Sequence, residues 1–327
     1  MSQSEKVKIY MQVMRDTLGA GRITAVEQPG AVVLGNFDGI HQGHRALLRA
    51  ASEIAERCGW RRRVLTFSPH PRAQLGDEQF KLIYDEQQKT EIMRETGLVD
   101  ELVFLSFDKA LQTMPAEAFF EQVLCQRYLA KAVIVGENFH FGYRGQGDAA
   151  LLRRLCESRG MLCQTLRRVT DGGAAISSSR IRMLLKKGEV EEAGRLLGRP
   201  YIIEGTVSHG KRLGTRLHTP TINILMSEER LAPKKGVYVS YTRARGEGFP
   251  SISNVGHNPT VGGESLRTET HLLDFSGDLY GEAVQVELLT FLRPERQFES
   301  VEALQTQLLT DIAKAKDFFI GGSHEEI

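Results

Sequence analysis

Short apolar runs alternate with longer amphipathic stretches along the first half of the chain. Short apolar runs, which are typical of strands buried on both faces, cover residues 31–35, 64–67, 102–105 and 132–135, and a last strand is expected at 162–169. Apolar residues at helical spacing lie between them, over residues 45–58, 86–96, 115–129 and 148–158. This order of strand, helix and strand predicts an α/β domain with a mainly parallel sheet, whose ligands lie at the carboxyl ends of the strands.

The pattern changes near residue 200. Two short helices are expected over 177–197, and Gly198 and Arg199-Pro200 then end the helical pattern. Runs rich in β-branched and aromatic residues follow at 201–207, 236–242, 251–255, 268–275 and 283–289, and an amphipathic helix is expected at 300–319. The sequence predicts two domains: an α/β domain over 1–199, and an antiparallel β-barrel or sandwich with a closing helix over 200–327.

Composition and charge limit the kinds of molecule that this protein is expected to bind. The chain has 327 residues and a net charge of +1, and residues 1–199 carry 29 basic against 24 acidic side chains. This mildly basic balance suits nucleotides but is too weak to indicate DNA or RNA binding. The basic run 61–63 is expected in a solvated turn. Four cysteines without metal-site spacing, no signal peptide and no apolar run of about 18 residues predict a cytoplasmic protein without a membrane contact.

A loop with two histidines joins the first apolar run to the first helix. It reads Gly-Asn-Phe-Asp-Gly-Ile-His-Gln-Gly-His over 35–44. Its glycines allow sharp turns and a close approach to a ligand, and the helix N-terminus offers N–H groups to phosphate. His41 and His44 add two donors that can follow charge developing on phosphate. The loop favours phosphate binding; the alternative is a capping loop with two surface histidines.

With this H-x-G-H loop, the chain resembles the prokaryotic bifunctional riboflavin kinase/FMN adenylyltransferase family along nearly its whole length. The resemblance implies a Rossmann-like nucleotidyltransferase domain in which His41 and His44 are catalytic. It implies ATP phosphate contacts at Gly35, Phe37, Asp38, Gly39 and Gly43.

Three further segments of this domain carry the resemblance. The motif at 66–71 implies flavin contacts by Phe67, Pro69 and His70, and the stretch at 136–142 implies one by Asn138. The motif Ile-Ser-Ser-Ser-Arg-Ile-Arg at 176–182 implies ATP contacts by Ser178, Ser179 and Arg182. The family has Asp and Arg where this chain has Asn138 and His140. A strand-end turn at 66–71 and a helix N-cap at 177–179 are the alternatives.

The segment 205–223 resembles the glycine-rich region and P-T-A-N motif of riboflavin kinases. The resemblance implies that Gly210 and Gly214 bind ATP phosphates, and that Thr221 and Asn223 bind Mg²⁺ through hard oxygen atoms. This chain departs from the family at Ile222, where Ala is usual, and around His218, where the family has more glycine. Taken alone, the motif reads as a turn.

Glu269 lies in a strand-like run that matches the family's E-x-H region. The resemblance implies that Glu269 accepts the proton of the ribityl 5′-hydroxyl of riboflavin as this group attacks the γ-phosphorus of ATP. Taken alone, a strand glutamate reads as a solvated surface residue.

The two motif sets together imply a transferase with two activities. It would phosphorylate riboflavin to FMN and then adenylylate FMN to FAD and pyrophosphate, with ATP and Mg²⁺ in both steps. Its partners would be riboflavin, FMN, FAD and ATP, without nucleic acid. Two alternatives are an enzyme that retains one activity and a non-enzymatic flavin-binding regulator. The oligomeric state stays open.

Overall fold

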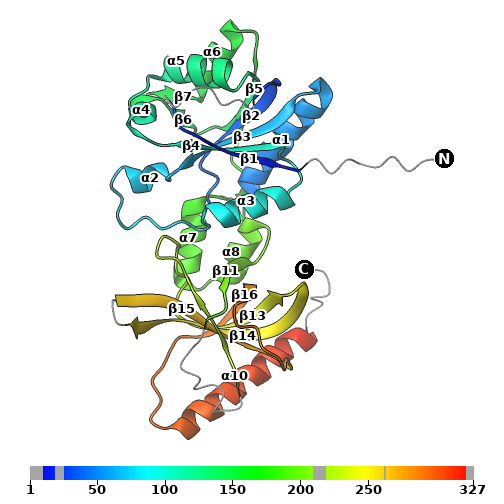
Figure 1. Ribbon diagram of the computed structural model, residues 1–327, viewed down its shortest axis with the longest axis vertical. Helices are drawn as coiled ribbons and strands as arrows, with labels where there is room; N and C mark the ends of the chain where they lie inside the picture. The colour runs from blue at the N-terminus through cyan, green and yellow to red at the C-terminus, as the bar shows by residue number, and fades with distance from the viewer. Residues whose placement is uncertain (1–9, 19–25, 209–218, 261–262, 322–327) are drawn as a thin grey trace, which may run out of the picture. The chain divides into compact units, whose positions relative to one another are not determined.

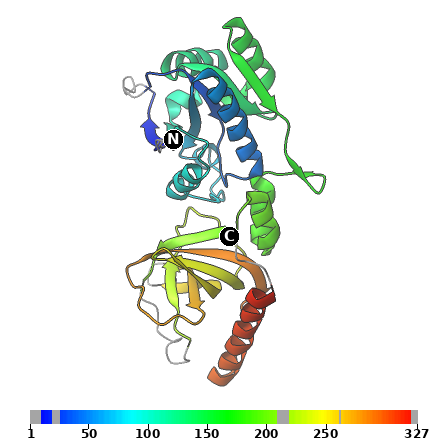
Figure 2. The ribbon, with the colours of Figure 1, turned by 90° about the vertical axis from the view of Figure 1, so that its right-hand side faces the viewer.

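The computed structural model describes residues 10–18, 26–208, 219–260 and 263–321, with the backbone alone at 257–260 and 263–265. The chain divides into two compact units, Met1–Ser177 and Ser178–Ile327 (Figure 1 and Figure 2). Each unit is described by itself. Among the residues described, no helix is long and apolar enough to cross a membrane.

A six-stranded sheet in the order β1-β4-β3-β2-β5-β8 forms the first unit, and every neighbouring pair is parallel. The strands are β1 (Gln12–Asp16), β2 (Gly30–Leu34), β3 (Arg61–Ser68), β4 (Glu101–Ser106), β5 (Ala130–Gly136) and β8 (Leu162–Leu166). The expected parallel sheet is confirmed. The chain runs from β2 out to β3 and β4 and later returns to β5 beside β2, so the strand order reverses between β2 and β5. Ligands of such sheets bind at this reversal, at the carboxyl ends of the strands.

The helices of the first unit follow the expected order. They are α1 (Gln42–Cys58), α2 (Pro71–Gln74), α3 (Glu86–Glu95), α4 (Lys109–Gln112), α5 (Ala116–Ala118) and α6 (Ala149–Ser158). The structure adds β1, α2, α4, the 3-10 turn η2 (Tyr143–Gly145) and two small hairpins, β6 (His140–Phe141) with β7 (Gly147–Asp148) and β9 (Thr170–Asp171) with β10 (Ala174–Ala175). These elements are too short, or too polar, to show a period in the sequence.

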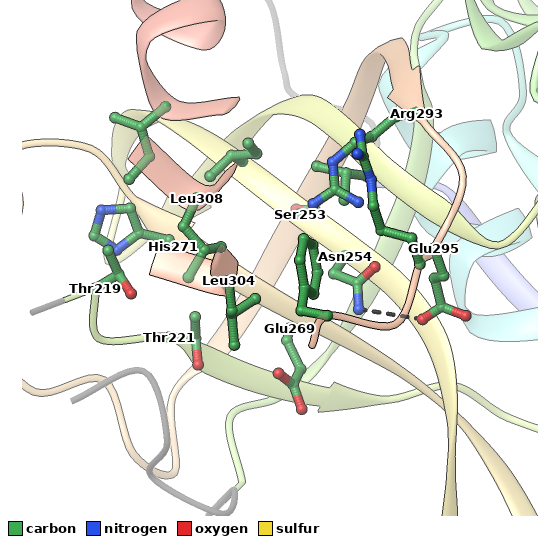
Figure 3. Close-up of a pocket in the computed structure, with 15 residues that line it drawn as sticks. Thr219, Thr221, Ser253, Asn254, Glu269, His271, Arg293, Glu295, Leu304 and Leu308 are labelled. Atoms are coloured by element: carbon green, nitrogen blue, oxygen red, sulfur yellow. Dashed lines mark hydrogen bonds between the residues drawn. The ribbon is translucent and has the colours of Figure 1, made fainter. Parts of the chain in front are cut away.

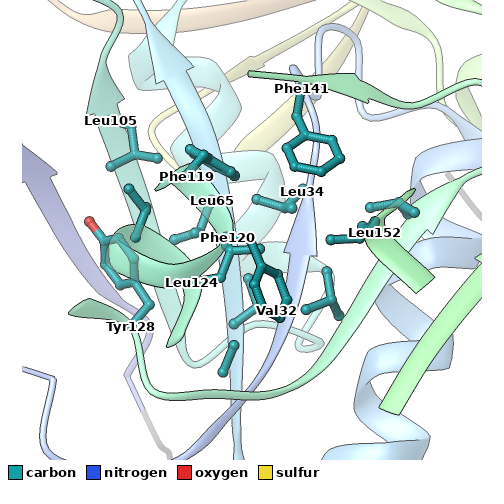
Figure 4. Packing of buried hydrophobic residues seen from close by; sticks show 14 of the residues in the cluster. Val32, Leu34, Leu65, Leu105, Phe119, Phe120, Leu124, Tyr128, Phe141 and Leu152 are labelled. Carbon is teal, nitrogen blue, oxygen red and sulfur yellow. The ribbon is translucent and has the colours of Figure 1, made fainter. Parts of the chain in front are cut away.

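The helix expected over 115–129 is α-helical only at α5 and continues as a π-helix, η1 (Phe119–Arg127). A bond of 3.0 Å from the Tyr128 N–H to the Val123 carbonyl, five residues back, closes its last turn. The buried side chains of η1 pack with Leu34, Leu65 and Leu152 in one hydrophobic core (Figure 4). Apolar spacing predicts the helix, whereas this packing decides its type.

Arg63 is fully buried, so the expected solvated turn at 61–63 is wrong for this residue. The strand β3 begins at Arg61 and places Arg63 opposite Glu101 of β4. Its guanidinium donates to Glu101 Oε2 over 2.5 Å and to the Gln28 carbonyl over 3.2 Å. A carboxylate and carbonyl oxygens offset the cost of burying this charge.

A second six-stranded sheet, in the order β11-β16-β13-β14-β15-β12 with antiparallel neighbours, forms a nearly closed barrel in the second unit. The strands are β11 (Tyr201–Thr206), β12 (Ile222–Leu225), β13 (Gly236–Ala244), β14 (Glu247–Thr260), β15 (Gly263–Leu272) and β16 (Ala283–Arg293). A bond of 2.8 Å from the Ser208 N–H to the Asn223 carbonyl connects the two edges of the sheet. The expected barrel is confirmed, and β12, which begins in the Pro-Thr-Ile-Asn motif, is a strand that the sequence analysis did not predict.

Three helices accompany the barrel: α7 (Ser178–Lys187), α8 (Val190–Leu197) and α10 (Val301–Gly321). The second compact unit begins before α7, whereas the sequence analysis placed the domain boundary after α8. α8 packs against β11 and β16 of the barrel. The boundary between the functional domains therefore stays a prediction.

The two faces of the barrel wall differ in chemistry. Small hydroxyl side chains fill part of the interior, where Ser240 bonds to Ser251 and Ser253 over 2.8 and 2.7 Å, and Ser253 bonds to Thr270 over 2.7 Å. The outer face is apolar, with Val237, Val239 and Ile252 packed against Ala315 of α10. Because successive strand residues point to opposite faces, residues that alternate with these hydroxyls, such as Glu269, point outward beside α10.

Candidate active sites

The histidine loop leaves β2 at the carboxyl edge of the first sheet, beside β5, where the strand order reverses. His41 is the N-cap of α1, and its Nδ1 accepts the His44 N–H over 3.3 Å. An accepting Nδ1 leaves the proton of the neutral ring on Nε2, so this atom is a donor. The His41 and His44 rings stack with centroids 3.7 Å apart. Two imidazoles therefore stand together at a helix N-terminus, which is a favourable place for phosphate.

Left-handed backbone conformations shape the loop. Phe37, Gly39 and Ile40 have φ angles of 48°, 90° and 42°, and two of these three residues are not glycine. The side chains of Phe37 and Ile40 are fully buried. Such conformations persist only where surrounding contacts hold them.

Asp38 supplies one of these contacts. Its carboxylate is 1% exposed, and Oδ1 accepts the backbone N–H groups of Ile83 and Tyr84 over 2.9 and 3.4 Å. The carboxylate therefore ties the loop to the turn before α3. Phosphate binding at Asp38, expected from the sequence, stays a prediction, and it rests on the backbone rather than on this side chain.

Gly43 leaves room for the His41 ring. A Cβ at this position would lie 3.1 Å from both Cε1 and Nδ1 of His41, which is closer than side chains normally pack. We expect Gly43→Ala to displace the ring and lower the rate of adenylyl transfer by about tenfold, since small misplacements of catalytic groups are costly. Steady-state assays of FAD formation from FMN check this. Gly321→Ala is the control, because a Cβ there meets nothing within 4 Å and Gly321 has no positive φ; an unchanged rate in Gly43→Ala would contradict the tight fit.

The expected flavin residues follow the strands that flank β2. Phe67, at the end of β3, is half-buried and meets Phe107 edge-on with centroids 5.8 Å apart. Pro69 is exposed, and His70 stacks on Phe80 at 4.3 Å and caps α2 by accepting the Arg72 N–H over 3.2 Å. Because the carboxyl ends of parallel strands share one edge, these aromatic groups lie on the same edge as the histidine loop.

Asn138 is exposed in the turn after β5, the strand next to β2. His140 is also exposed, and its Nδ1 is 3.3 Å from the Gly145 carbonyl, to which it donates. The position of Asn138 suits a ligand at the reversal point. The flavin role of Asn138 stays a prediction.

The serine motif begins next to the histidine loop. The carbonyl oxygen of Ile176 is 3.8 Å from the position that a Cβ on Gly43 would take. Ser178 and Ser179 open α7, which also carries Arg182, and this helix belongs to the second compact unit. The ATP contacts expected of these three residues therefore stay predictions.

A cavity of about 290 Å³ lies between the outer face of the barrel and α10 (Figure 3). One part of its wall is apolar and contains Val237, Ile252, Phe298, Leu304, Leu308 and Ile312. Thr219, Thr221, Asn254, Glu269 and His271 form a polar part. This combination suits a ligand that has both an apolar and a polar part.

Glu269 and Thr221 line the same cavity, although they come from different segments. Glu269 lies on β15 between Asn223 of β12 and Asn254 of β14 in the strand register. The Nδ1 of His271 donates to the Pro220 carbonyl over 2.8 Å and so holds the Pro-Thr-Ile-Asn segment beside Glu269. The predicted base and one predicted metal ligand are thus brought together.

Thr221 and Asn223 are two residues apart on an extended segment, so their side chains point to the same face. Asn223 is 4% exposed, and its Oδ1 accepts Arg267 Nη1 over 3.4 Å. Within the described chain, no group of three or more His, Cys, Asp or Glu residues is arranged for a metal. Two oxygen ligands fit a magnesium ion that keeps its waters and binds substrate phosphates. Gly210, Gly214 and His218 lie outside the described residues.

Sequence reasoning missed part of the cavity beneath α10. Asn254, Arg293, Glu295 and Phe298 line it, and the Asn254 Nδ2 donates to Glu295 Oε1 over 3.3 Å (Figure 3). Asn254 lies in the run expected at 251–255, whereas Arg293, Glu295 and Phe298 lie between the run at 283–289 and the helix expected at 300–319, where no element was predicted. The apolar stripe of the last helix was recognised, but a stripe indicates burial and does not reveal a cavity beneath it.

Comparisons with known proteins agree along the chain. A family model described as FAD synthetase matches residues 23–180, and one described as riboflavin kinase matches residues 197–319. A bifunctional riboflavin kinase/FMN adenylyltransferase of Listeria monocytogenes is 34% identical over 291 residues, which cover 88% of this chain and 92% of the relative. The enzyme of the same name from Escherichia coli K12 is 33% identical over 304 residues, 92% and 96% of the two chains.

A solved structure is similar over almost the whole chain. It is a crystal structure described as a macrolide-efflux protein from Streptococcus pneumoniae, with a TM-score of 0.84, 30% identity, and coverage of 94% of this chain and 99% of that one. The FAD synthetase model matches the first part of the chain and the riboflavin kinase model the second, and the name of the curated relatives contains both activities. The chain therefore belongs to the bifunctional riboflavin kinase/FMN adenylyltransferase family.

Proposed function

We propose that this chain converts riboflavin to FMN at the barrel cavity and FMN to FAD at the histidine loop, with ATP in both steps. One observation carries the assignment of sites to steps. The imidazole pair at the α1 N-terminus lies within the FAD synthetase match, and the cavity with Glu269 and Thr221 lies within the riboflavin kinase match.

Phosphorylation requires a base beside the ribityl 5′-hydroxyl. The isoalloxazine ring fits the apolar wall of the cavity, and the ribityl chain then extends toward Glu269 and Thr221. Glu269 accepts the hydroxyl proton while the oxygen attacks the γ-phosphorus of ATP, and ADP leaves. Thr221 and Asn223 would hold Mg²⁺, which neutralises phosphate charge when bound. Gly210 and Gly214 would hold phosphates through their N–H groups.

Adenylyl transfer requires donors around the α-phosphorus. A phosphate oxygen of FMN attacks this atom and pyrophosphate leaves, so no covalent intermediate on the protein is needed. The Nε2–H of His41, the His44 ring and the α1 N-terminus donate to the phosphate oxygens on which negative charge grows. Ser178, Ser179 and Arg182 would bind the remaining phosphates of ATP.

A flavin site fits the aromatic edge beside this loop. The ring surfaces of Phe67 and His70, with Pro69 and Asn138 nearby in the sheet order, suit the isoalloxazine of FMN. The use of ATP and four free cysteines support a cytoplasmic location.

Chromatography of flavins after incubation of the pure protein tests the assignment. With riboflavin, ATP and Mg²⁺ we expect FMN and then FAD, and with FMN and ATP we expect FAD. A chelator should stop both reactions, and excess Mg²⁺ should restore them. If riboflavin gives FMN but no FAD, and supplied FMN gives no product, the protein has only the kinase activity. FAD only from supplied FMN would leave only the adenylyltransferase, and no turnover in either tube would contradict the enzymatic function.

A further inference from the structure

A buried lysine lies under the histidine loop. Lys89 of α3 is 4% exposed, and its Nζ donates to the Asn36 carbonyl over 2.9 Å. Burial lowers the pKa of Lys89, and the carboxylates of Asp38 and Glu86 oppose this shift. Burying an ammonium group costs free energy, so we expect an interaction that offsets this cost.

The hydrogen bond from Lys89 fixes the orientation of one peptide plane, that between Asn36 and Phe37. Thr66 Oγ1 donates to the same Asn36 carbonyl over 3.0 Å, so two donors hold this oxygen. In a planar trans peptide the N–H points opposite to the C=O. The Phe37 N–H therefore points away from Lys89 and Thr66.

The held orientation is the strained one. Phe37 has a φ of 48°, in the left-handed region. Rotating the Asn36–Phe37 peptide by about 180° would move this φ to about −130°, in the broadly allowed extended region. Such strain is comparable with the strength of one hydrogen bond from a charged donor, so the loss of Lys89 would lower the free-energy cost of rotating the peptide, although Thr66 would still hold the oxygen.

A purely structural account would make Lys89 a counter-ion for Asp38. The contacts indicate a further role in positioning the loop, because the Nζ of Lys89 donates its hydrogen bond to the carbonyl of a loop residue. The Asp38 Oδ1 accepts two backbone N–H groups of its own. The ammonium thus acts on the loop backbone directly.

We propose that Lys89 is a positioning residue for adenylyl transfer: its ammonium holds the Asn36–Phe37 peptide so that the Phe37 N–H faces the phosphates of ATP. This inference rests on the function proposed above for the histidine loop. The donor would contribute as charge develops in the transition state, so its loss would lower kcat more than it raises KM.

Steady-state kinetics of FAD formation from FMN, with Lys89→Met and Lys89→Arg, test the proposal. We expect Lys89→Met to lower kcat at least about tenfold with KM for ATP changed less than about threefold, and Lys89→Arg to recover most of the loss. The riboflavin kinase rate of the same sample should stay at the wild-type value. Lys131→Met, at an exposed lysine of β5, is the matched control.

A wild-type kcat in Lys89→Met, or an equal loss of both activities, would overturn the proposal. Thr66→Val removes the second donor to Asn36 with little change in shape, and it should also lower kcat. If Lys89→Met does not fold, an unchanged kcat in Thr66→Val would overturn the proposal instead. A wild-type protein that forms no FAD from FMN would overturn the function of the loop, which is a different result.

Discussion

We expect the replacement of Glu269 by Gln to stop the formation of FMN from riboflavin, while FAD still forms from supplied FMN. Gln keeps the size of the side chain but cannot accept the hydroxyl proton. The loss of a general base typically costs about 10²- to 10⁴-fold in rate. Chromatography of the flavins from parallel incubations with riboflavin and with FMN measures both steps in one preparation.

The control for this experiment is Glu247→Gln, at an exposed glutamate at the start of β14 that does not line the cavity. It should keep both rates. A kinase rate in Glu269→Gln within a few-fold of the wild type would remove Glu269 from the role of base. Equal damage to both steps would contradict the assignment of the two sites to two units.

The second large effect is expected at His41. His41→Ala should slow FAD formation from FMN by about 10²- to 10³-fold, as does the removal of one preorganised donor in comparable sites. The formation of FMN from riboflavin should stay near the wild-type rate, because the cavity at Glu269 belongs to the other unit. Initial rates of both steps, measured on the same sample, check this.

His41 also caps α1, so its two roles must be separated. The Nδ1 accepts the His44 N–H, and losing an N-cap costs about 0.5–2 kcal/mol of stability. Asn is a good N-cap residue, so His41→Asn should restore the melting temperature without restoring FAD formation. Recovery of the rate in His41→Asn would show that His41 serves the helix and not the chemistry.

Much of the fold can be predicted from the sequence, because helices, strands and turns depend on residues that are close together along the chain. The five buried residues of β2 form one apolar run, and the alternation in β13 to β15 reflects a wall with two faces. Gly198 ends α8 in a left-handed conformation, as expected for a helix terminus. The histidine loop was recognisable too, since its glycines, histidines and helix N-terminus lie within ten consecutive residues.

Other features appear only when distant segments meet. The burial of Arg63 depends on Glu101, and the π-helical turns of η1 depend on packing against the sheet. The cavity exists because α10 packs against β14, the neighbour of the strand that carries Glu269, while a bond from His271 to Pro220 brings Thr221 to the same wall.

The sequence by itself determined the two fold classes and the order of the longer strands and helices, and its motifs predict the segments that carry the chemistry. Periodicity and motifs reflect local interactions, which depend on residues that are close together in the sequence. The tertiary structure alone decided that Asp38 faces inward and that Lys89 holds the Asn36 carbonyl, 53 residues away along the chain. Such contacts depend on how the sheet and its helices pack, and no local pattern encodes that packing.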